Sequence, residues 1–341
     1  MYIGFFNYYK FYNRNRMFTD KSSPIGDDLI YPFVYLGEYL AKRGHRVSTI
    51  DMDNIEHFDA IVFMEFPTFK NGYFRRLVDD KSKPLYLLIF ESKVIKPDNW
   101  NIENHRYFKK IFTWDDDLID NKKYFKINFS SKIPTDLDFD INKKNRLCTM
   151  IAGNKSANHS LELYTERTRA IRWFEENHPG DFDLYGIGWD KHLFMGMLSK
   201  LNRFDALRKI VKPRYSSYRG SIESKREVYE KYKFAICYEN ARDIPGYVTE
   251  KIFDCFFAGC VPIYWGAPNI ADHIPANTFI DKRNFKTYEE LYDYLINMSD
   301  KEYSDYLDAI KTFVKSDEMY PFSVEYFAKT LTEAVVGEFQ Q

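Results

Sequence analysis

Short apolar runs alternate with amphipathic stretches along the first half of this sequence. Runs without polar alternation are typical of strands that are buried on both faces of a parallel sheet. A helix is expected at 29–43, with Asp27 or Asp28 as its cap. Its first turn tolerates Pro32, and Gly44 marks its end. The expected strands are 2–6, 46–51, 59–66 and 85–90.

The same alternation returns in the second half, where Ser160 is the expected cap of the first helix. Strands separated by helices of this length indicate a parallel sheet with helices on its faces. The basic stretch 191–221 resists assignment. The expected strands are 147–152, 181–185, 234–238, 261–265 and 278–281. The expected helices are 160–177, 223–231, 247–257, 287–298, 302–315 and 324–338.

Two α/β halves imply two domains, which a chain of 341 residues accommodates comfortably. The charged run NKKN at 142–145 follows a proline-containing segment and is the expected boundary. We therefore predict one domain at 1–145 and a second domain at 146–320. A C-terminal helix at 321–341 is expected to pack back on the first domain.

Composition narrows the class of protein. The formal net charge of -1 argues against nucleic acid as a partner. No run of about 18 apolar residues exists, and the N-terminus lacks the apolar region of a signal peptide. We expect a cytoplasmic protein, either free or peripheral to the inner face of a membrane. The 4 cysteines lack metal-ligand spacing and are predicted to be buried thiols.

The stretch 233–267 concentrates polar residues between two apolar runs. A helix is expected between these runs, and Gly259 closes it. On that helix the spacing places Tyr247, Glu250 and Lys251 on one surface, where a strand ends and a helix begins. In open α/β sheets this edge is where ligands bind.

The same stretch resembles a known family over some thirty consecutive positions. It contains YEN at 238–240, YVTEK at 247–251, AG at 258–259, VP at 261–262 and G-x-P at 266–268. This pattern resembles the donor-binding signature of the α1,3/4-fucosyltransferases, glycosyltransferase family 10, in a bacterial-type soluble form. The resemblance implies the GT-B architecture, in which two Rossmann-like domains face a cleft and helices end the chain.

The resemblance also implies an activity. Family members transfer L-fucose from GDP-fucose with inversion, so an α1,3-type transfer to O3 of GlcNAc or Glc is expected. The partners would be a GDP-sugar and an oligosaccharide or glycolipid-linked acceptor. No cofactor is expected, and a divalent cation would be at most stimulatory.

Donor-binding residues follow from the matching positions. The resemblance implies that Tyr247, Glu250 and Lys251 hold the GDP-sugar, with Asn240 nearby. It also implies an arginine on the helix before Asp183-Leu184-Tyr185-Gly186. Counting back gives Arg169, with neighbours Arg167 and Arg172. A guanidinium, an ammonium and a helix N-terminus each stabilise charge on a leaving diphosphate.

An inverting transfer needs a base that takes the proton from the acceptor hydroxyl. The family places a glutamate after a strand of the first domain, and the matching residue here is Glu91, although its neighbours differ from the family pattern. Glu65, Asp51 and Asp53 also lie near strand ends and remain alternatives.

Two acidic triplets leave open the hypothesis of a metal-dependent transferase. Asp51-Met52-Asp53 and Asp115-Asp116-Asp117 have the carboxylates that suit Mg²⁺. Such triplets are common, so we favour strand ends and turns for them. Two further hypotheses stay open: a sibling transferase that uses another GDP-deoxysugar, and a GDP-sugar-binding protein without catalysis.

Overall fold

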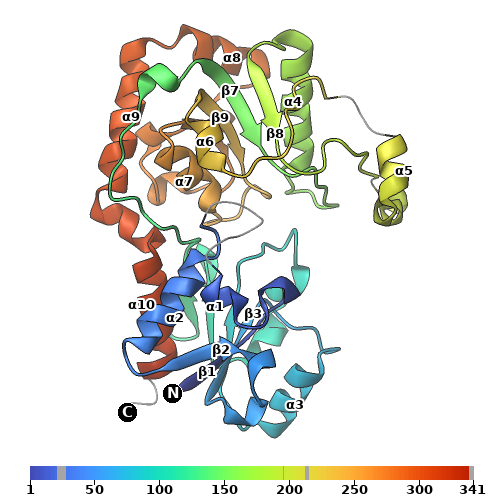
Figure 1. Cartoon of the computed structure of the whole chain (residues 1–341), viewed down its shortest axis with the longest axis vertical. Helices are drawn as coiled ribbons and strands as arrows, with labels where there is room; N and C mark the ends of the chain where they lie inside the picture. Colours follow the sequence, from blue (N-terminus) through green and yellow to red (C-terminus); the bar gives the residue numbers. More distant parts are fainter. Residues whose placement is uncertain (21–27, 195, 212–214, 338–341) are drawn as a thin grey trace. The chain divides into compact units, whose positions relative to one another are not determined.

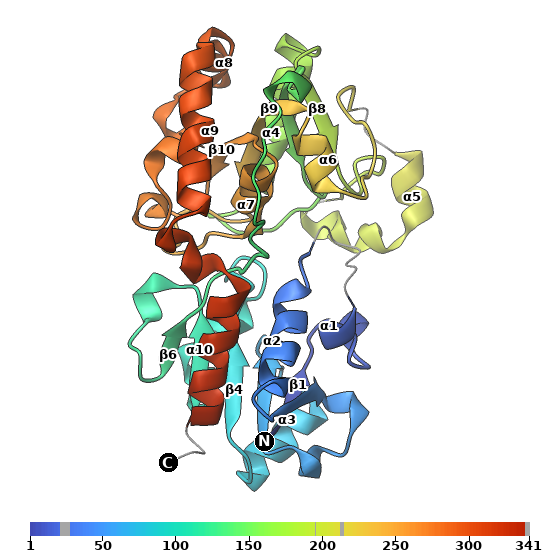
Figure 2. The ribbon, with the colours of Figure 1, turned by 60° about the vertical axis from the view of Figure 1, so that its left-hand side comes forward.

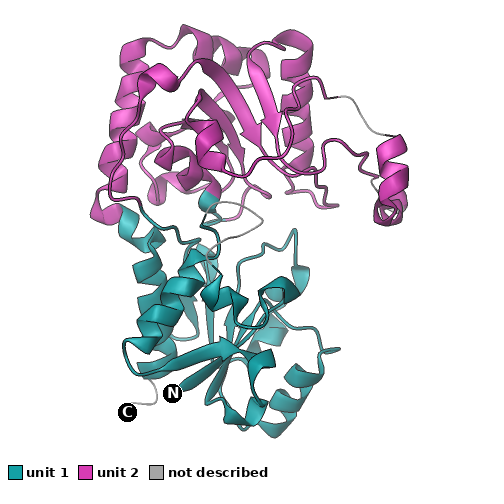
Figure 3. Cartoon of the chain, viewed as in Figure 1, with its two compact units in different colours: residues 1–133, 245–250, 319–341 teal, residues 134–244, 251–318 magenta. Residues whose placement is uncertain are grey.

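The computed structural model describes residues 1–20, 28–194, 196–211 and 215–337 (Figure 1). The chain divides into two compact units, coloured separately in Figure 3. Unit 1 comprises 1–133, 245–250 and 319–341, and unit 2 comprises 134–244 and 251–318. The charged run at 142–145 thus lies inside unit 2 rather than at the boundary. The reason is Lys144, whose buried ammonium donates to the carbonyls of Tyr229 and Ala258 at 3.0 and 2.8 Å.

Unit 1 is built on a six-stranded parallel sheet with the order β2-β1-β3-β4-β5-β6. The strand order reverses between β1 and β3, and ligands of such sheets bind at the carboxyl ends of the strands beside the reversal. The strands are β1 (Tyr2–Phe6), β2 (Arg46–Thr49), β3 (Ala60–Met64), β4 (Leu85–Leu88), β5 (Lys110–Thr113) and β6 (Tyr124–Lys126). The helices are α1 (Arg16–Thr19), α2 (Tyr31–Ala41), α3 (Gly72–Asp80) and α10 (Val324–Val336).

Both faces of the unit 1 sheet are covered by helices. Phe5, Val62 and Leu88 pack on one face with α2 and α10. Phe63 and Leu87 point to the other face and pack with α3. Because successive residues of a strand alternate between faces, burial on both sides requires apolar residues at every position. This explains the continuous apolar runs in the sequence.

The C-terminal helix α10 belongs to the core of unit 1. It lies beside α2 in both views (Figures 1 and 2), and the Phe327 and Phe33 rings meet edge-on at 5.4 Å. Lys110 also donates a hydrogen bond of 2.9 Å to the carbonyl of Ala334. The last helix of the chain therefore completes a face that α2 alone would leave uncovered.

Unit 2 has a five-stranded parallel sheet with the order β11-β10-β9-β7-β8. The order reverses between β7 and β9. At the outer edge, Tyr218 forms an isolated parallel bridge with Leu184, so part of the unassigned stretch 191–221 extends the sheet. The strands are β7 (Arg146–Ile151), β8 (Phe182–Tyr185), β9 (Tyr232–Tyr238), β10 (Val261–Trp265) and β11 (Ile280–Asp281). The helices are α4 (Tyr164–Asn177), α5 (Asp205–Ile210), α6 (Lys225–Tyr229), α7 (Glu250–Phe257), α8 (Tyr288–Asn297) and α9 (Asp300–Val314).

The helix starts follow local capping chemistry. Thr287 and Ser299 accept backbone N–H groups at the starts of α8 and α9, as hydroxyl caps do. Two expected caps were wrong. Ser160 precedes the start of α4, and Asp28 has a left-handed backbone (φ 51°) before α2. The alternative cap, Asp27, lies outside the described residues.

Four elements of unit 1, namely α1, α3, β5 and β6, were not expected from the sequence. In the part of the chain that the structure describes, no helix is long and apolar enough to cross a membrane. All 4 cysteines are buried and free, as predicted.

Candidate functional site

Glu91 follows β4 at the carboxyl edge of the unit 1 sheet. Its side chain is half-buried, and its Oε1 accepts a hydrogen bond of 2.6 Å from the hydroxyl of Tyr9. Burial and the charge of Glu91 raise the pKa of Tyr9, so the phenol stays neutral and acts as a donor. The predicted base thus keeps one oxygen hydrogen-bonded at a surface that a ligand can reach.

Four side chains hold the main chain at Glu91. Its N–H donates to Glu65 Oε1 at 3.1 Å, and the N–H of Phe90 donates to the same oxygen at 3.1 Å. Its carbonyl accepts from Asn99 Nδ2 at 3.3 Å and from Trp100 Nε1 at 3.1 Å. Trp114 Nε1 donates to the carbonyl of Phe90 at 2.8 Å. Because the main chain at Glu91 is held on both sides, the Glu91 carboxylate points in one direction.

Glu65 is a buried carboxyl and cannot meet an acceptor. Only 1% of the residue is exposed, its backbone is left-handed (φ 63°), and its oxygens accept three N–H groups, including one from Asn99. Burial, followed by the charge of Glu91, raises the pKa of Glu65 to about 8. The structure therefore gives Glu65 a supporting position beneath Glu91 and removes it as an alternative base.

The raised pKa of Glu65 predicts a pH dependence of folding. Between pH 4.5, the ordinary value, and about 8, folded Glu65 keeps a proton that the unfolded chain releases. The free energy of unfolding should therefore fall as pH rises through this window, by at most about 1.4 kcal/mol per pH unit from this group. Glu65→Gln should flatten the slope in denaturant titrations. Glu103→Gln, at a carboxylate that is 84% exposed, should keep it, and equal slopes in all three proteins would contradict the account.

The acidic triplets have structural partners. Asp51 accepts from the N–H of Arg14 at 2.8 Å, and Asp53 bonds His57 at 2.7 Å. Asp115 caps a short 3-10 helix, and Asp116 pairs with Lys126 at 2.5 Å. Among the described residues, no group of three or more histidines, cysteines and acids is placed to hold a metal. These contacts favour the interpretation that both triplets are strand ends and turns.

In unit 2, charged side chains gather at the carboxyl end of β9. Lys251 Nζ lies 3.1 Å from Oε2 of Glu239, whose side chain is fully buried. Arg167 is also buried and donates to the carbonyl of Tyr238 at 2.6 Å and to Asn240 Oδ1 at 3.0 Å. We call Arg167, Glu239, Asn240 and Lys251 the β9 cluster. The cluster contains two cationic side chains, Arg167 and Lys251, and one carboxylate, that of Glu239. Its net charge is therefore positive, which suits a diphosphate.

Arg169 lies outside the β9 cluster. Its side chain is 67% exposed and pairs with Glu166 one turn earlier on α4. Arg172 pairs with Glu175 at 2.7 Å. Because residues two apart on a helix face different sides, Arg167 and Arg169 cannot both turn toward Asn240. The structure brings Arg167 to Asn240, and donor binding by Arg169 stays a prediction.

Tyr247 and Glu250 do not lie on one helical surface, contrary to the prediction. α7 begins at Glu250, so Tyr247 lies in the preceding loop within unit 1, and the shared helical face was wrong. Gly246 explains the break: its φ is 76°, and a Cβ there would lie 2.3 Å from the carbonyl oxygen of Trp114. The Tyr247 ring is 1% exposed and packs on Trp114 at 4.5 Å. The predicted roles of Tyr247 and Glu250 toward the donor remain predictions.

Two members of the β9 cluster were not chosen from the sequence. Glu239 lies inside the YEN motif. The available signal was an acidic residue at the end of a predicted strand, followed by a basic residue near the start of the next predicted helix. Arg167 was named only as a neighbour, because counting residues cannot tell which arginine of a helix is buried.

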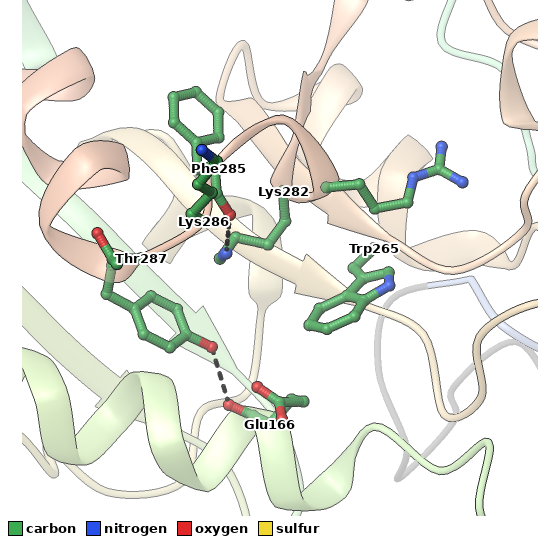
Figure 4. Close-up of a pocket in the computed structure, with 8 residues that line it drawn as sticks. Glu166, Trp265, Lys282, Phe285, Lys286 and Thr287 are labelled. Carbon is green, nitrogen blue, oxygen red and sulfur yellow. Dashed lines mark hydrogen bonds between the residues drawn. The ribbon is translucent and has the colours of Figure 1, made fainter.

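A cavity of about 370 Å³ opens at the carboxyl ends of β10 and β11 (Figure 4). Trp265, Tyr288, Glu166 and Lys282 are among its lining residues. The Lys282 ammonium donates to the carbonyl of Phe285 at 3.0 Å, and burial lowers its pKa. The cavity and the β9 cluster lie at the ends of neighbouring strands, since the carbonyl of Trp265 accepts the N–H of Glu239 at 2.8 Å.

The fold is that of the GT-B glycosyltransferases. It matches a crystal structure of an α1,3-fucosyltransferase with GDP, with a TM-score of 0.56 and 14% identity over 98% of this chain and 90% of that chain. It also matches Anabaena HepE in complex with UDP and glucose, with a TM-score of 0.57 and 11% identity over 99% and 100% of the two chains. At such identities the likeness shows the fold alone.

The sequence defines the family. The model of glycosyltransferase family 10 (fucosyltransferase), C-terminal part, matches residues 141–326, more than half of the chain. The chain belongs to this family. It is 40% identical over 75 residues to the α-(1,3)-fucosyltransferase FucT of Helicobacter pylori and 40% identical over 77 residues to an α-(1,4)-fucosyltransferase of Arabidopsis thaliana. These segments cover 22% of this chain in each case, and only 16% and 19% of the two relatives.

Proposed function

We propose that this protein transfers L-fucose from GDP-fucose, with inversion, to a hydroxyl of a glycan or glycolipid-linked acceptor, with O3 of GlcNAc or Glc as the expected position. The observation that carries the proposal is the β9 cluster, a positively charged group of buried and partly buried side chains inside the region that matches the fucosyltransferase family. The relatives named for α-(1,3)- and α-(1,4)-transfer support the sugar and the type of linkage.

The chemistry divides into a donor part and an acceptor part. When the bond to fucose breaks, negative charge grows on the diphosphate of GDP. Lys251 and Arg167 supply an ammonium and a guanidinium that stabilise this charge. Their carboxylate and amide partners, Glu239 and Asn240, fix them before the donor arrives. Glu91 takes the proton from the attacking acceptor hydroxyl, which becomes the new glycosidic oxygen.

A donor panel tests the choice of sugar nucleotide. GDP-fucose, GDP-mannose, another GDP-deoxysugar and UDP-glucose would be offered to the protein with labelled sugars and a mixed glycan array. We expect label from GDP-fucose alone to enter the array. Faster transfer from another GDP-deoxysugar would replace fucose in the proposal, and tight GDP binding without any transfer would indicate a binding protein.

We further propose that catalysis needs no metal, because cationic side chains of the β9 cluster take the place that a divalent cation would fill at the diphosphate. Transfer measured in excess EDTA should keep the rate of the untreated enzyme within about twofold, whereas loss of a bridging metal would cost several kcal/mol of stabilisation. Full loss of activity in EDTA, restored by Mg²⁺ or Mn²⁺, would overturn this part of the proposal.

A further inference from the structure

The loops after β1 and β4 meet around the carboxylate of Glu91. The first carries Asn7, Tyr8 and Tyr9, and the second carries Glu91 and Ser92. β1 and β4 flank β3 in the sheet, so their carboxyl ends lie on either side of its end. The hydrogen bond between Tyr9 and Glu91 joins the two loops across the end of β3. This place lies at the strand-order reversal, where ligands of such sheets bind.

The Tyr9 hydroxyl occupies the position that an acceptor hydroxyl needs. A general base must lie within hydrogen-bond distance of the proton that it takes, and the Tyr9 oxygen is 2.6 Å from Glu91 Oε1. Tyr9 is itself a poor proton donor to the base, since burial and the charge of Glu91 raise its pKa. A neutral hydroxyl on the carboxylate is the arrangement that the acceptor would reproduce.

Two buried polar atoms beside this contact lack partners among the described residues. They are Oδ1 of Asn7 and Oγ of Ser92, in residues that are 5% and 0% exposed. Asn7 uses only its amide nitrogen, which donates to the carbonyl of Tyr12 at 3.3 Å. Buried polar atoms are nearly always hydrogen-bonded in folded proteins, so this pair marks a place where a ligand hydroxyl or an ordered water completes the site.

An aromatic surface borders the same place. Tyr8 and Tyr9 are 48% and 38% exposed, and their rings meet edge-on at 5.2 Å. The ammonium of Lys96, a residue that is 6% exposed, lies 4.7 Å from the centre of the Tyr8 ring and holds that ring in place. Exposed aromatic rings are suited to the apolar C–H face of a sugar, while nearby polar atoms orient its hydroxyls.

We propose that Tyr8 and Tyr9 form the binding platform for the acceptor, a neutral pyranose whose attacking hydroxyl replaces the Tyr9 hydroxyl on Glu91. The acceptor oxygen forms the bond to the anomeric carbon of fucose, its proton passes to Glu91, and GDP leaves with the electron pair of the broken bond. This inference rests on the proposed function and on Glu91 as its base.

Because the platform binds the acceptor, substitutions in it should change the KM for the acceptor and not the KM for GDP-fucose. Tyr8→Ala and Tyr9→Ala should each raise the KM for the acceptor by about tenfold, a factor of ten being 1.4 kcal/mol of binding, and leave the KM for GDP-fucose unchanged. Tyr9→Phe keeps the ring and removes the competing hydroxyl, so it should lower the acceptor KM. Tyr73→Ala, at a tyrosine of α3 that is 51% exposed, is the matched control and should change neither constant.

Two results would overturn the inference: an unchanged acceptor KM in both alanine variants, or a Tyr9→Phe enzyme that is as impaired as Tyr9→Ala. Melting temperatures of all variants should stay near that of the wild type, since the substituted rings are exposed. If the wild-type protein transfers no fucose, the proposed function fails first. Saturation-transfer NMR with the acceptor glycan alone then still reports whether Tyr8→Ala weakens sugar binding.

Discussion

Glu91→Gln is expected to lower kcat for fucosyl transfer by about 100- to 10,000-fold while the enzyme still binds GDP-fucose. The amide has the shape of the carboxylate and can still accept from the Tyr9 hydroxyl, which is 2.6 Å from Oε1. It cannot take a proton from the acceptor. Because Glu65, Asn99 and Trp100 hold the main chain of residue 91, the substitution should leave the surrounding structure intact.

The measurement is a steady-state comparison of transfer, paired with calorimetric titration of GDP. Glu103→Gln removes a carboxylate of unit 1 that is 84% exposed, and it serves as the matched control. A Glu91→Gln enzyme that keeps more than about a tenth of the wild-type kcat would assign the base to another carboxylate, because general-base catalysis contributes at least that factor.

The second large effect is expected at Lys251. Lys251→Met removes the ammonium that we place at the diphosphate, so the affinity for GDP should fall by about 10- to 100-fold. It also removes the cation that lies 3.1 Å from the buried carboxylate of Glu239. Breaking a buried ion pair in this way costs stability, here up to about 3 kcal/mol because Lys251 is itself 24% exposed. Both GDP affinity and melting temperature should therefore drop.

A double variant separates the two effects. Lys251→Met with Glu239→Gln also removes the buried negative charge, so it should recover most of the melting temperature but not the affinity for GDP. Lys301→Met, at a lysine of unit 2 that is 84% exposed, should change neither quantity. If GDP affinity returned together with stability in the double variant, Lys251 would be a structural residue and the donor would bind elsewhere.

The expected strands were largely correct because parallel strands buried on both faces need uninterrupted apolar residues. All nine expected strands correspond to observed ones, with small differences at their ends, as β4 (Leu85–Leu88) shows. The short strands β5 and β6 on one side of the unit 1 sheet were missed. Lys110 begins β5, and its ammonium reaches the α10 carbonyl of Ala334, a contact between segments far apart in the sequence. Such long-range pairing leaves no periodic signal.

The candidate site was harder to predict in detail, because chemistry depends on which side of an element a residue faces. The motif of 238–251 correctly indicated the family, since the family model matches residues 141–326. It did not show that Gly246 breaks the helix before Glu250 and leaves Tyr247 packed on Trp114. Nor did it show that Arg167, rather than Arg169, is the arginine that reaches Asn240.

The most direct test of the central claim is transfer from labelled GDP-fucose to a glycan array, followed by NMR assignment of the product linkage. We predict that fucose joins a hydroxyl of one acceptor class, with inversion at its anomeric carbon, in excess EDTA, and that the Glu91→Gln enzyme gives almost no product. No transfer to any acceptor by a wild-type protein that binds GDP tightly, or a product with the anomeric configuration retained, would contradict it.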